Sequence, residues 1–399
     1  TSMPTLFIVG SRGIPANYGG FETFAEEIAT RLSKRGMEVY VTCEHTSSSS
    51  PQPDTYKGVN LLHVQAPDNH LRTIVADCKA LRMCRDRAEP GDIIYLLGYG
   101  VGPFAWPVIR SIKNQGIRFW LNPDGLEWQR PRWSTFASAY LYLAERVLLR
   151  YADRVICDAE AIKGYHRDEN GVSSDRMTVI EYGAPLMNGI PDGMQRRRNR
   201  YLEDRGLQTG DYYLYVGRCV PDNNMELMIR GVLDKRVRRK LLVISNYDEN
   251  RSFYRHLKRV IAESGQSEKV VMSNGVYEQP LLQAIRSGAF AYVHGHEAGG
   301  TNPALIEAMG VGCLCVGVDV PFVREVLGGA GILFDKRVEN FVQTLLETEA
   351  LSDTEIDAFS SKAQQRVRER YNWTRITDEY ERLLRPTMHR RQEAASLAE

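Results

Sequence analysis

The sequence lacks any cysteine pattern that would indicate a disulfide framework or a zinc site. Its seven cysteines are odd in number and scattered, at positions 43, 78, 84, 157, 219, 313 and 315. Disulfide-rich secreted domains carry even numbers of cysteines, and zinc sites usually carry them in close pairs. The cysteine pattern therefore predicts a reduced, cytoplasmic environment.

An excess of charge and long apolar runs are also absent. Lys and Arg number 51 against 50 Asp and Glu, so the net charge of +1 gives no field that would favour nucleic acid as a partner. No run approaches the roughly 18 apolar residues that span a bilayer, and no stretch resembles a signal peptide. These absences predict a cytosolic protein.

Two series of alternating strands and helices are present. The first begins with an apolar strand, Thr5 to Gly10, followed by a glycine-containing loop and a helix from Phe21. The second begins with a strand at Asp211 to Val216, followed by Gly217 and Arg218. Such series indicate Rossmann-like domains, although the first loop does not have the GxGxxG spacing of a dinucleotide site.

The chain is therefore expected to be an α/β protein with two Rossmann-like domains facing across a cleft. At 399 residues it is long enough for two or three domains. The expected divisions are an N-terminal domain at 1–185, a linker at 186–205 with four arginines within five residues, a C-terminal domain at 206–370, and a C-terminal helix at 371–399.

The stretch from His294 to Met309 carries the clearest sign of a ligand site. Gly299 and Gly300 would let the backbone approach a ligand closely, and Asn302 and Pro303 suit the N-cap and first position of a helix. The N–H groups at such a helix start favour an anion such as phosphate. A tight strand-to-helix turn with ordinary capping is the alternative. Gly19 and Gly20 form a second stretch of this kind.

Other candidates follow expected strands of the first domain. Asp124 lies in the loop after the strand 118–121, and the alternative is a turn residue before Gly125. The stretch 129–133 is basic and aromatic, which suits a phosphate-bearing ligand or interface packing. The helix 71–87 carries five cations, which indicate contact with a membrane surface or simply a solvated face.

Four motifs together resemble one known family. They are IVGSRGIPANYGGFETF (8–24), RFWLNPDGLEWQRPRWS (118–134), YVGRCVPDNN (215–224) and HGHEAGGTNPALIEAM (294–309). With them the chain resembles retaining glycosyltransferases of the GT-B type in glycosyltransferase family 4. It resembles in particular the bacterial β-1,4-rhamnosyltransferases that act on lipid-linked sugars.

The resemblance implies that the N-terminal domain binds the acceptor and the C-terminal domain binds a nucleotide sugar. It places Arg218 on the donor diphosphate and Glu307 on the nucleotide ribose, with Glu297 and Asp124 facing the sugars. Catalytic roles are thus implied for Asp124, Arg218 and Glu297. The remaining implied donor-binding residues are Gly19, Gly20, Asn223, Gly299, Gly300, Thr301 and Asn302, and the implied acceptor-binding residues are Tyr18, Glu22, Asp124, Glu127, Trp128 and Arg130.

The sequence also departs from the family pattern. The lysine that usually follows the Gly-Arg motif is replaced by Asp222-Asn223-Asn224. Of the family's two glutamates eight positions apart, Glu307 matches the second, while Gly299 stands at the first and Glu297 lies two residues earlier. No Asp-x-Asp motif is present, so no metal or other cofactor is expected.

The implied reaction is transfer of L-rhamnose from dTDP-rhamnose to a glucose or N-acetylglucosamine on undecaprenyl diphosphate, during polysaccharide assembly. The protein would then work at the inner face of the cytoplasmic membrane as a peripheral protein. Two alternatives stay open. One is a transferase of the same fold that uses GDP-mannose or a UDP-sugar, and the other is a nucleotide-sugar-binding protein without transferase activity.

Overall fold

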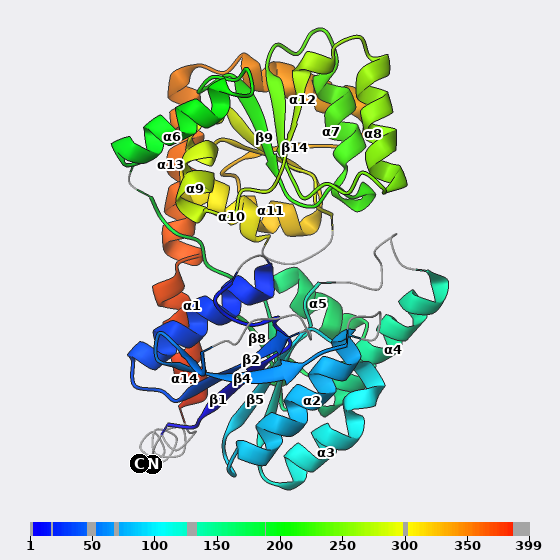
Figure 1. Cartoon of the computed structure of the whole chain (residues 1–399), viewed down its shortest axis with the longest axis vertical. Coiled ribbons are helices and arrows are strands. Elements are labelled where there is room, and N and C mark those ends of the chain that lie inside the picture. Colours follow the sequence, from blue (N-terminus) through cyan, green and yellow to red (C-terminus); the bar gives the residue numbers. More distant parts are fainter. Residues whose placement is uncertain are drawn as a thin grey trace, which may run out of the picture. The chain divides into compact units, whose positions relative to one another are not determined.

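The computed structural model describes residues 3–16, 19–45, 53–67, 72–125, 134–187, 189–297 and 302–385. The chain divides into two compact units (Figure 1). The first contains residues 1–129, 133–182 and 373–399, and the second contains residues 130–132 and 183–372. No helix in these described ranges combines the length and apolar character needed to cross a membrane.

The first unit is built on a sheet of eight strands in the order β3-β4-β2-β1-β5-β6-β7-β8. All neighbouring strands are parallel except β3, which pairs with β4 in the antiparallel sense. The residues of β1 and β5 are fully buried, as expected of central parallel strands covered on both faces. The strands are β1 (Leu6–Val9), β2 (Val39–His45), β3 (Thr55–Tyr56), β4 (Val59–Gln65), β5 (Ile93–Leu97), β6 (Arg118–Asn122), β7 (Arg154–Cys157) and β8 (Met177–Val179).

Helices connect these strands and cover the sheet. In α1, Phe24, Ile28 and Leu32 recur every fourth residue and are buried, so one helical stripe faces the core. The helices of this unit are α1 (Gly20–Lys34), α2 (Arg72–Arg87), α3 (Trp106–Asn114), α4 (Thr135–Tyr151), α5 (Glu160–Asp168) and α14 (Trp373–Leu384), with short 3-10 turns η1 (Gly102–Ala105) and η3 (Ser174–Arg176).

The C-terminal helix α14 belongs to the first unit, although the second unit precedes it in the chain. Its Ile376, Tyr380 and Leu384 are buried at four-residue spacing. The Tyr380 hydroxyl lies 2.9 Å from the Tyr95 hydroxyl of β5, and Arg35 at the end of α1 forms ion pairs with Asp378 and Glu381. Figure 1 shows α14 (red) alongside α1 (dark blue).

The second unit contains a six-stranded, wholly parallel sheet in the order β11-β10-β9-β12-β13-β14. Numbered within the unit, this order is 3-2-1-4-5-6, which is that of a Rossmann sheet. Ligands of such sheets bind beyond the carboxyl ends of the strands where the order reverses, here between β9 and β12. The strands are β9 (Tyr212–Val216), β10 (Lys240–Ile244), β11 (Val270–Ser273), β12 (Ala291–His294), β13 (Cys315–Val318) and β14 (Ile332–Phe334).

One helix of the second unit lies within the segment 186–205, which was expected to be a linker. Pro191 is the N-cap of α6, only Gly193 follows it among the glycines and prolines of the helix, and arginine is a good helix former. Leu202 near the end of the helix is buried, and Arg197 is paired with Glu278. The helices are α6 (Asp192–Glu203), α7 (Met225–Val232), α8 (Ser252–Glu263), α9 (Gln279–Gly288), α10 (Pro303–Gly310), α11 (Pro321–Leu327), α12 (Val338–Glu349) and α13 (Asp353–Arg370), with turns η4 (Pro221–Asn223) and η5 (Ser267–Lys269).

In the first sheet, strand order reverses between β1 and β5, and a glycine permits the two strands to end close together. Gly10 has φ +97°, and a Cβ there would lie 2.4 Å from the carbonyl oxygen of Leu97. Gly91 has nearly the same φ, +98°, but a Cβ there would meet nothing within 4 Å. The two positions therefore share backbone strain and differ only in crowding.

We predict that Gly10→Ala lowers the free energy of unfolding by about 2–4 kcal/mol, because strain at positive φ adds to the clash with Leu97. The matched variant Gly91→Ala should lose only about 1–2 kcal/mol, from backbone strain alone. Urea unfolding of both variants measures the difference. Equal losses would show that the close approach of β1 and β5 contributes nothing.

Candidate functional site

The loops after β9 and β12 pack tightly against each other where the order of the second sheet reverses. A Cβ at Gly295 would lie 2.2 Å from the carbonyl oxygen of Asn223, so no larger residue fits there without movement of the backbone. Asn223 itself is buried, and its side-chain amide donates to the Tyr215 hydroxyl and to the Arg218 carbonyl oxygen, at 2.9 and 3.0 Å. The buried Asn223 side chain thus fixes the backbone of the Arg218 loop, while the Arg218 side chain is exposed.

Asn224 joins the two loops. It has the left-handed backbone conformation, with φ 55° and ψ 30°, which asparagine tolerates better than most residues. Its amide donates to the Gly295 carbonyl oxygen at 2.8 Å and to Oε1 of Glu297 at 2.7 Å. The second carboxylate oxygen of Glu297 accepts from Nζ of Lys336 at 2.9 Å. The strained residue Asn224 therefore orients the Glu297 carboxylate. Strained backbone conformations of this kind cluster at functional sites.

Aromatic and imidazole rings form a stack beneath these loops. The Tyr215 and His296 rings are stacked at 5.7 Å between centroids, and those of His296 and His294 at 4.5 Å. His294 is fully buried, and neither of its ring nitrogens has a hydrogen-bond partner among the described residues. Burial, assisted by the neighbouring His296, holds the pKa of His294 well below its usual value. Burial therefore favours the neutral form of the His294 imidazole.

Glu307 on α10 forms a largely buried ion pair. One of its oxygens lies 2.6 Å from a terminal nitrogen of Arg286 on α9, with side-chain exposures of 17% for the glutamate and 2% for the arginine. Nε and Nη1 of Arg286 have no hydrogen-bond partner within the described part of the chain. Asn302 and Pro303 begin α10 as expected, but the Asn302 side chain makes no capping hydrogen bond.

In the first unit, Glu22 folds back over the glycine loop at the start of α1. Its Oε1 accepts from the backbone N–H of Arg12 at 3.0 Å. A Cβ at Gly19 would lie 1.9 Å from the other carboxylate oxygen, so the carboxylate covers this glycine directly. A negative charge at this position disfavours phosphate at Gly19 and Gly20 and suits a hydroxyl donor better.

Asp124 follows β6 in a left-handed turn, with φ 56°. Its backbone N–H donates at 2.9 Å to Oδ1 of buried Asn122, which forms an Asx-type turn. The Asn122 amide donates to the Tyr182 hydroxyl at 3.4 Å. Burial first, and then the charges of Asp158 and Asp124, raise the pKa of Tyr182 well above its usual value. Asp124 is thus half-exposed, and its backbone is held by the buried side chain of Asn122.

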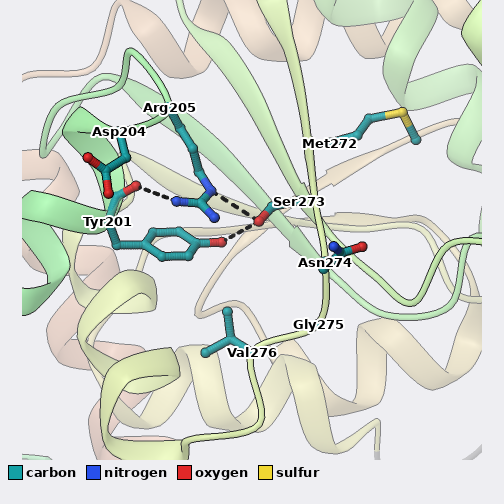
Figure 2. A pocket seen from close by; sticks show the side chains of 8 residues that line it. All are labelled: Tyr201, Asp204, Arg205, Met272, Ser273, Asn274, Gly275 and Val276. Atoms are coloured by element: carbon teal, nitrogen blue, oxygen red, sulfur yellow. Dashed lines mark hydrogen bonds between the residues drawn. The ribbon is translucent and has the colours of Figure 1, made fainter.

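A pocket of about 510 Å³ opens at the carboxyl end of β11 (Figure 2). The Tyr201 hydroxyl and Arg205 Nε both bond Ser273 Oγ, at 2.7 and 3.1 Å, and the guanidinium lies 3.7 Å from the Tyr201 ring centroid. The other lining residues are Asp204, Met272, Asn274, Gly275 and Val276. Because Tyr201 belongs to the helix that was not expected, this pocket was not predicted from the sequence.

Several predicted site residues lie outside the described part of the chain, namely Tyr18, Glu127, Trp128, Arg130, Gly299, Gly300 and Thr301. Of the others, the second unit contains Arg218, Asn223, Glu297, Asn302 and Glu307, and the first unit contains Gly19, Gly20, Glu22 and Asp124. The described residues include no group of three or more His, Cys, Asp or Glu placed to hold a metal ion.

Four further residues shape the site without having been predicted. They are Tyr215, Asn224, Arg286 and Lys336. Asn224 could have been found from the Asp-Asn-Asn run, because consecutive asparagines often mark left-handed turns. The other three offer no local signal, since their partners are set by pairing of distant strands and helices.

Two family models match the chain. Residues 3–185 match a domain of unknown function (DUF1972), and residues 210–349 match the family described as glycosyl transferases group 1. The match to glycosyl transferases group 1 covers most of the second unit. The D-inositol 3-phosphate glycosyltransferase of Kineococcus radiotolerans is 22% identical over 244 residues, which are 54% of this chain. The match spans about half of that relative, 52% of its length.

Several solved structures share the fold over nearly the whole chain. Sucrose-phosphate synthase from Thermosynechococcus elongatus is similar with a TM-score of 0.79 and 18% identity, covering 99% of this chain and all of that one. Anabaena HepE, solved in complex with UDP-glucose, has a TM-score of 0.71 and 15% identity, covering 96% of this chain and 99% of that one. The predicted two-domain GT-B fold is thereby confirmed.

Removal of Arg286 tests the buried ion pair of the second unit. We predict that Arg286→Met lowers the free energy of unfolding by about 3–5 kcal/mol, because the Glu307 carboxylate is left without its partner. The double variant Arg286→Met/Glu307→Gln should recover part of this loss. Arg230→Met, which breaks a surface pair with Glu226, is the control and should cost less than about 1 kcal/mol. A double variant less stable than Arg286→Met would contradict the prediction.

Proposed function

We propose that the protein is a nucleotide-sugar-dependent glycosyltransferase whose donor diphosphate binds where the strand order of the second sheet reverses. The main support is the meeting of the Arg218 and Glu297 loops at this point of a group 1 domain. An exposed guanidinium is well suited to a diphosphate because it forms bidentate, charge-assisted hydrogen bonds. Glu307, fixed by Arg286, would accept hydrogen bonds from the ribose.

The proposed donor is dTDP-rhamnose, and the proposed acceptor is a glucose or N-acetylglucosamine on undecaprenyl diphosphate. The four sequence motifs that resemble bacterial rhamnosyltransferases support this assignment. A UDP-sugar donor is the second candidate, and the similarity to Anabaena HepE, which was solved with UDP-glucose, supports it.

The proposed reaction retains the configuration of the transferred sugar. Cleavage of the sugar–phosphate bond builds positive charge on the sugar and negative charge on the leaving diphosphate. Arg218 would stabilise the diphosphate electrostatically, and this type of stabilisation is usually the largest catalytic contribution. The leaving phosphate oxygen would take the proton of the acceptor hydroxyl. Asp124 and Glu297 would orient the acceptor hydroxyl or stabilise the cationic sugar.

A donor screen tests this proposal. The protein is incubated with dTDP-rhamnose, UDP-sugars and GDP-mannose and a short-chain lipid-diphosphate-glucose acceptor, and products are measured by mass spectrometry. We expect a rhamnosylated product, and we expect Arg218→Ala to lower kcat/KM by about 100- to 1,000-fold through loss of diphosphate stabilisation.

The matched control is Arg230→Ala, an exposed arginine on α7 that pairs with Glu226, and its activity should equal that of the wild type. Product from a UDP-sugar or GDP-mannose alone would select the alternative donor. Nucleotide-sugar binding without turnover for any donor would favour a binding protein. Full activity of Arg218→Ala would refute the mechanism.

We further propose that the first unit contacts the membrane surface through α2. Two of its arginines are already engaged in ion pairs, Arg72 with Glu44 and Arg85 with Asp86. Arg82 and Arg87 are exposed. A surface of this kind would be attracted to anionic lipid headgroups, with a strength that falls as salt is added.

Reversal of three charges on α2, Arg82→Glu/Arg85→Glu/Arg87→Glu, should weaken binding to vesicles containing anionic lipid by about tenfold or more in a sedimentation assay, since each basic residue near such a surface contributes about 1 kcal/mol. The control makes the same charge change on α6, with Arg196→Glu/Arg197→Glu/Arg200→Glu. Unchanged binding after reversal on α2, or equal loss in the control, would rule out this surface.

A further inference from the structure

Lys336 is the single lysine in the loops that lead from the carboxyl ends of the second sheet's strands to the following helices. These loops comprise residues 217–224, 245–251, 274–278, 295–302, 319–320 and 335–337. They form the edge at which ligands of a Rossmann sheet bind. A diphosphate bound at this edge would need cations. Besides the arginines of these loops, Lys336 is the one lysine among their residues that could supply one.

The Lys336 side chain pairs with a carboxylate in the loop after β12, beside the reversal point, and not with the carboxylates nearest to it in the sequence. Its strand, β14, is two positions from β12 in the sheet, which corresponds to about 10 Å. Lys336 nevertheless bonds Glu297, in the loop after β12, at 2.9 Å. The nearer carboxylates already hold arginines, since Asp335 pairs with Arg337 and Asp319 pairs with Arg324.

The contacts of Glu297 connect this ammonium group to the Arg218 loop. Glu297 also accepts from Asn224, and the adjacent Asn223 bonds the Arg218 carbonyl oxygen. Arg218, Lys336 and Glu297 together carry a formal charge of +1, because they comprise two cations and one carboxylate, of which Lys336 contacts the carboxylate. The diphosphate of a nucleotide sugar carries a negative charge on each phosphate, so it matches the two cations once the carboxylate no longer neutralises one of them.

We propose that Lys336 is the second cation of the diphosphate site, held by Glu297 without donor and transferred to the phosphates when donor binds. This inference rests on the proposed function. The ion pair is readily exchanged, because its side chains are 49% and 35% exposed and therefore screened by water. Lysine suits such a change of partner, since its ammonium is a point charge on a flexible stem. The exchange also frees the Glu297 carboxylate to face the sugar.

Nucleoside diphosphate binding tests the role of Lys336. Affinities for UDP, dTDP and GDP are measured by isothermal titration calorimetry on the full chain at low salt. Lys336→Gln should weaken binding by about tenfold or more, the usual effect of losing a hydrogen bond to a charged group, and Lys336→Arg should restore part of it. The matched control is Arg337→Gln, the adjacent cation that pairs with Asp335, which should bind as the wild type does.

A second pair of variants tests the exchange itself. Glu297→Gln should strengthen diphosphate binding, because the ammonium group no longer has a competing carboxylate. This gain should vanish in Glu297→Gln/Lys336→Gln. Wild-type affinity in a folded Lys336→Gln protein, with an unchanged melting temperature, would overturn the inference and leave the proposed function standing. Absence of binding by the wild type to all three nucleotides would instead remove the proposed function, and the inference with it.

Discussion

The close packing of Gly295 against the Asn223 carbonyl oxygen is the constraint on which the site in the second unit depends. A Cβ at position 295 would lie only 2.2 Å from this oxygen, so only glycine fits there. The loops after β9 and β12 therefore meet backbone to backbone. Asn224 then takes a left-handed conformation and its amide reaches both Gly295 and Glu297. The carboxylate is therefore oriented by contacts that the sheet topology brings about.

The two units place carboxylates differently at their glycine-containing loops. In the first unit, Glu22 covers Gly19 and satisfies the Arg12 amide, so the charge is committed to the fold. In the second unit, Glu297 pairs with an exposed lysine in an arrangement that water screens. The Glu22 carboxylate has no cationic partner among its described contacts, whereas Glu297 faces an ammonium group that an anionic ligand could share. This difference favours the second unit as the place where an anionic ligand binds.

Most strands and helices could be predicted because their patterns are local. The predicted strand at 5–10 contains β1, the predicted helix at 71–87 contains α2, and the predicted strand at 211–216 contains β9. Helix α6 was not predicted, because its arginine-rich sequence has little apolar periodicity and its support comes from Leu202 and the pair with Glu278. That support depends on α9, far along the chain, and so leaves no local pattern.

The sequence by itself determined the α/β class, the alternation of strands and helices, and the glycine-containing loops, since each follows from spacing over a few residues. It also determined that Arg218 and Glu297 lie shortly after strand ends. Only the tertiary structure decided that Glu297 bonds Lys336, 39 residues away, and that Glu307 pairs with buried Arg286. The reason is physical: the order of strands in a sheet, set by packing of the whole unit, decides which loop ends meet, and no local pattern encodes that order.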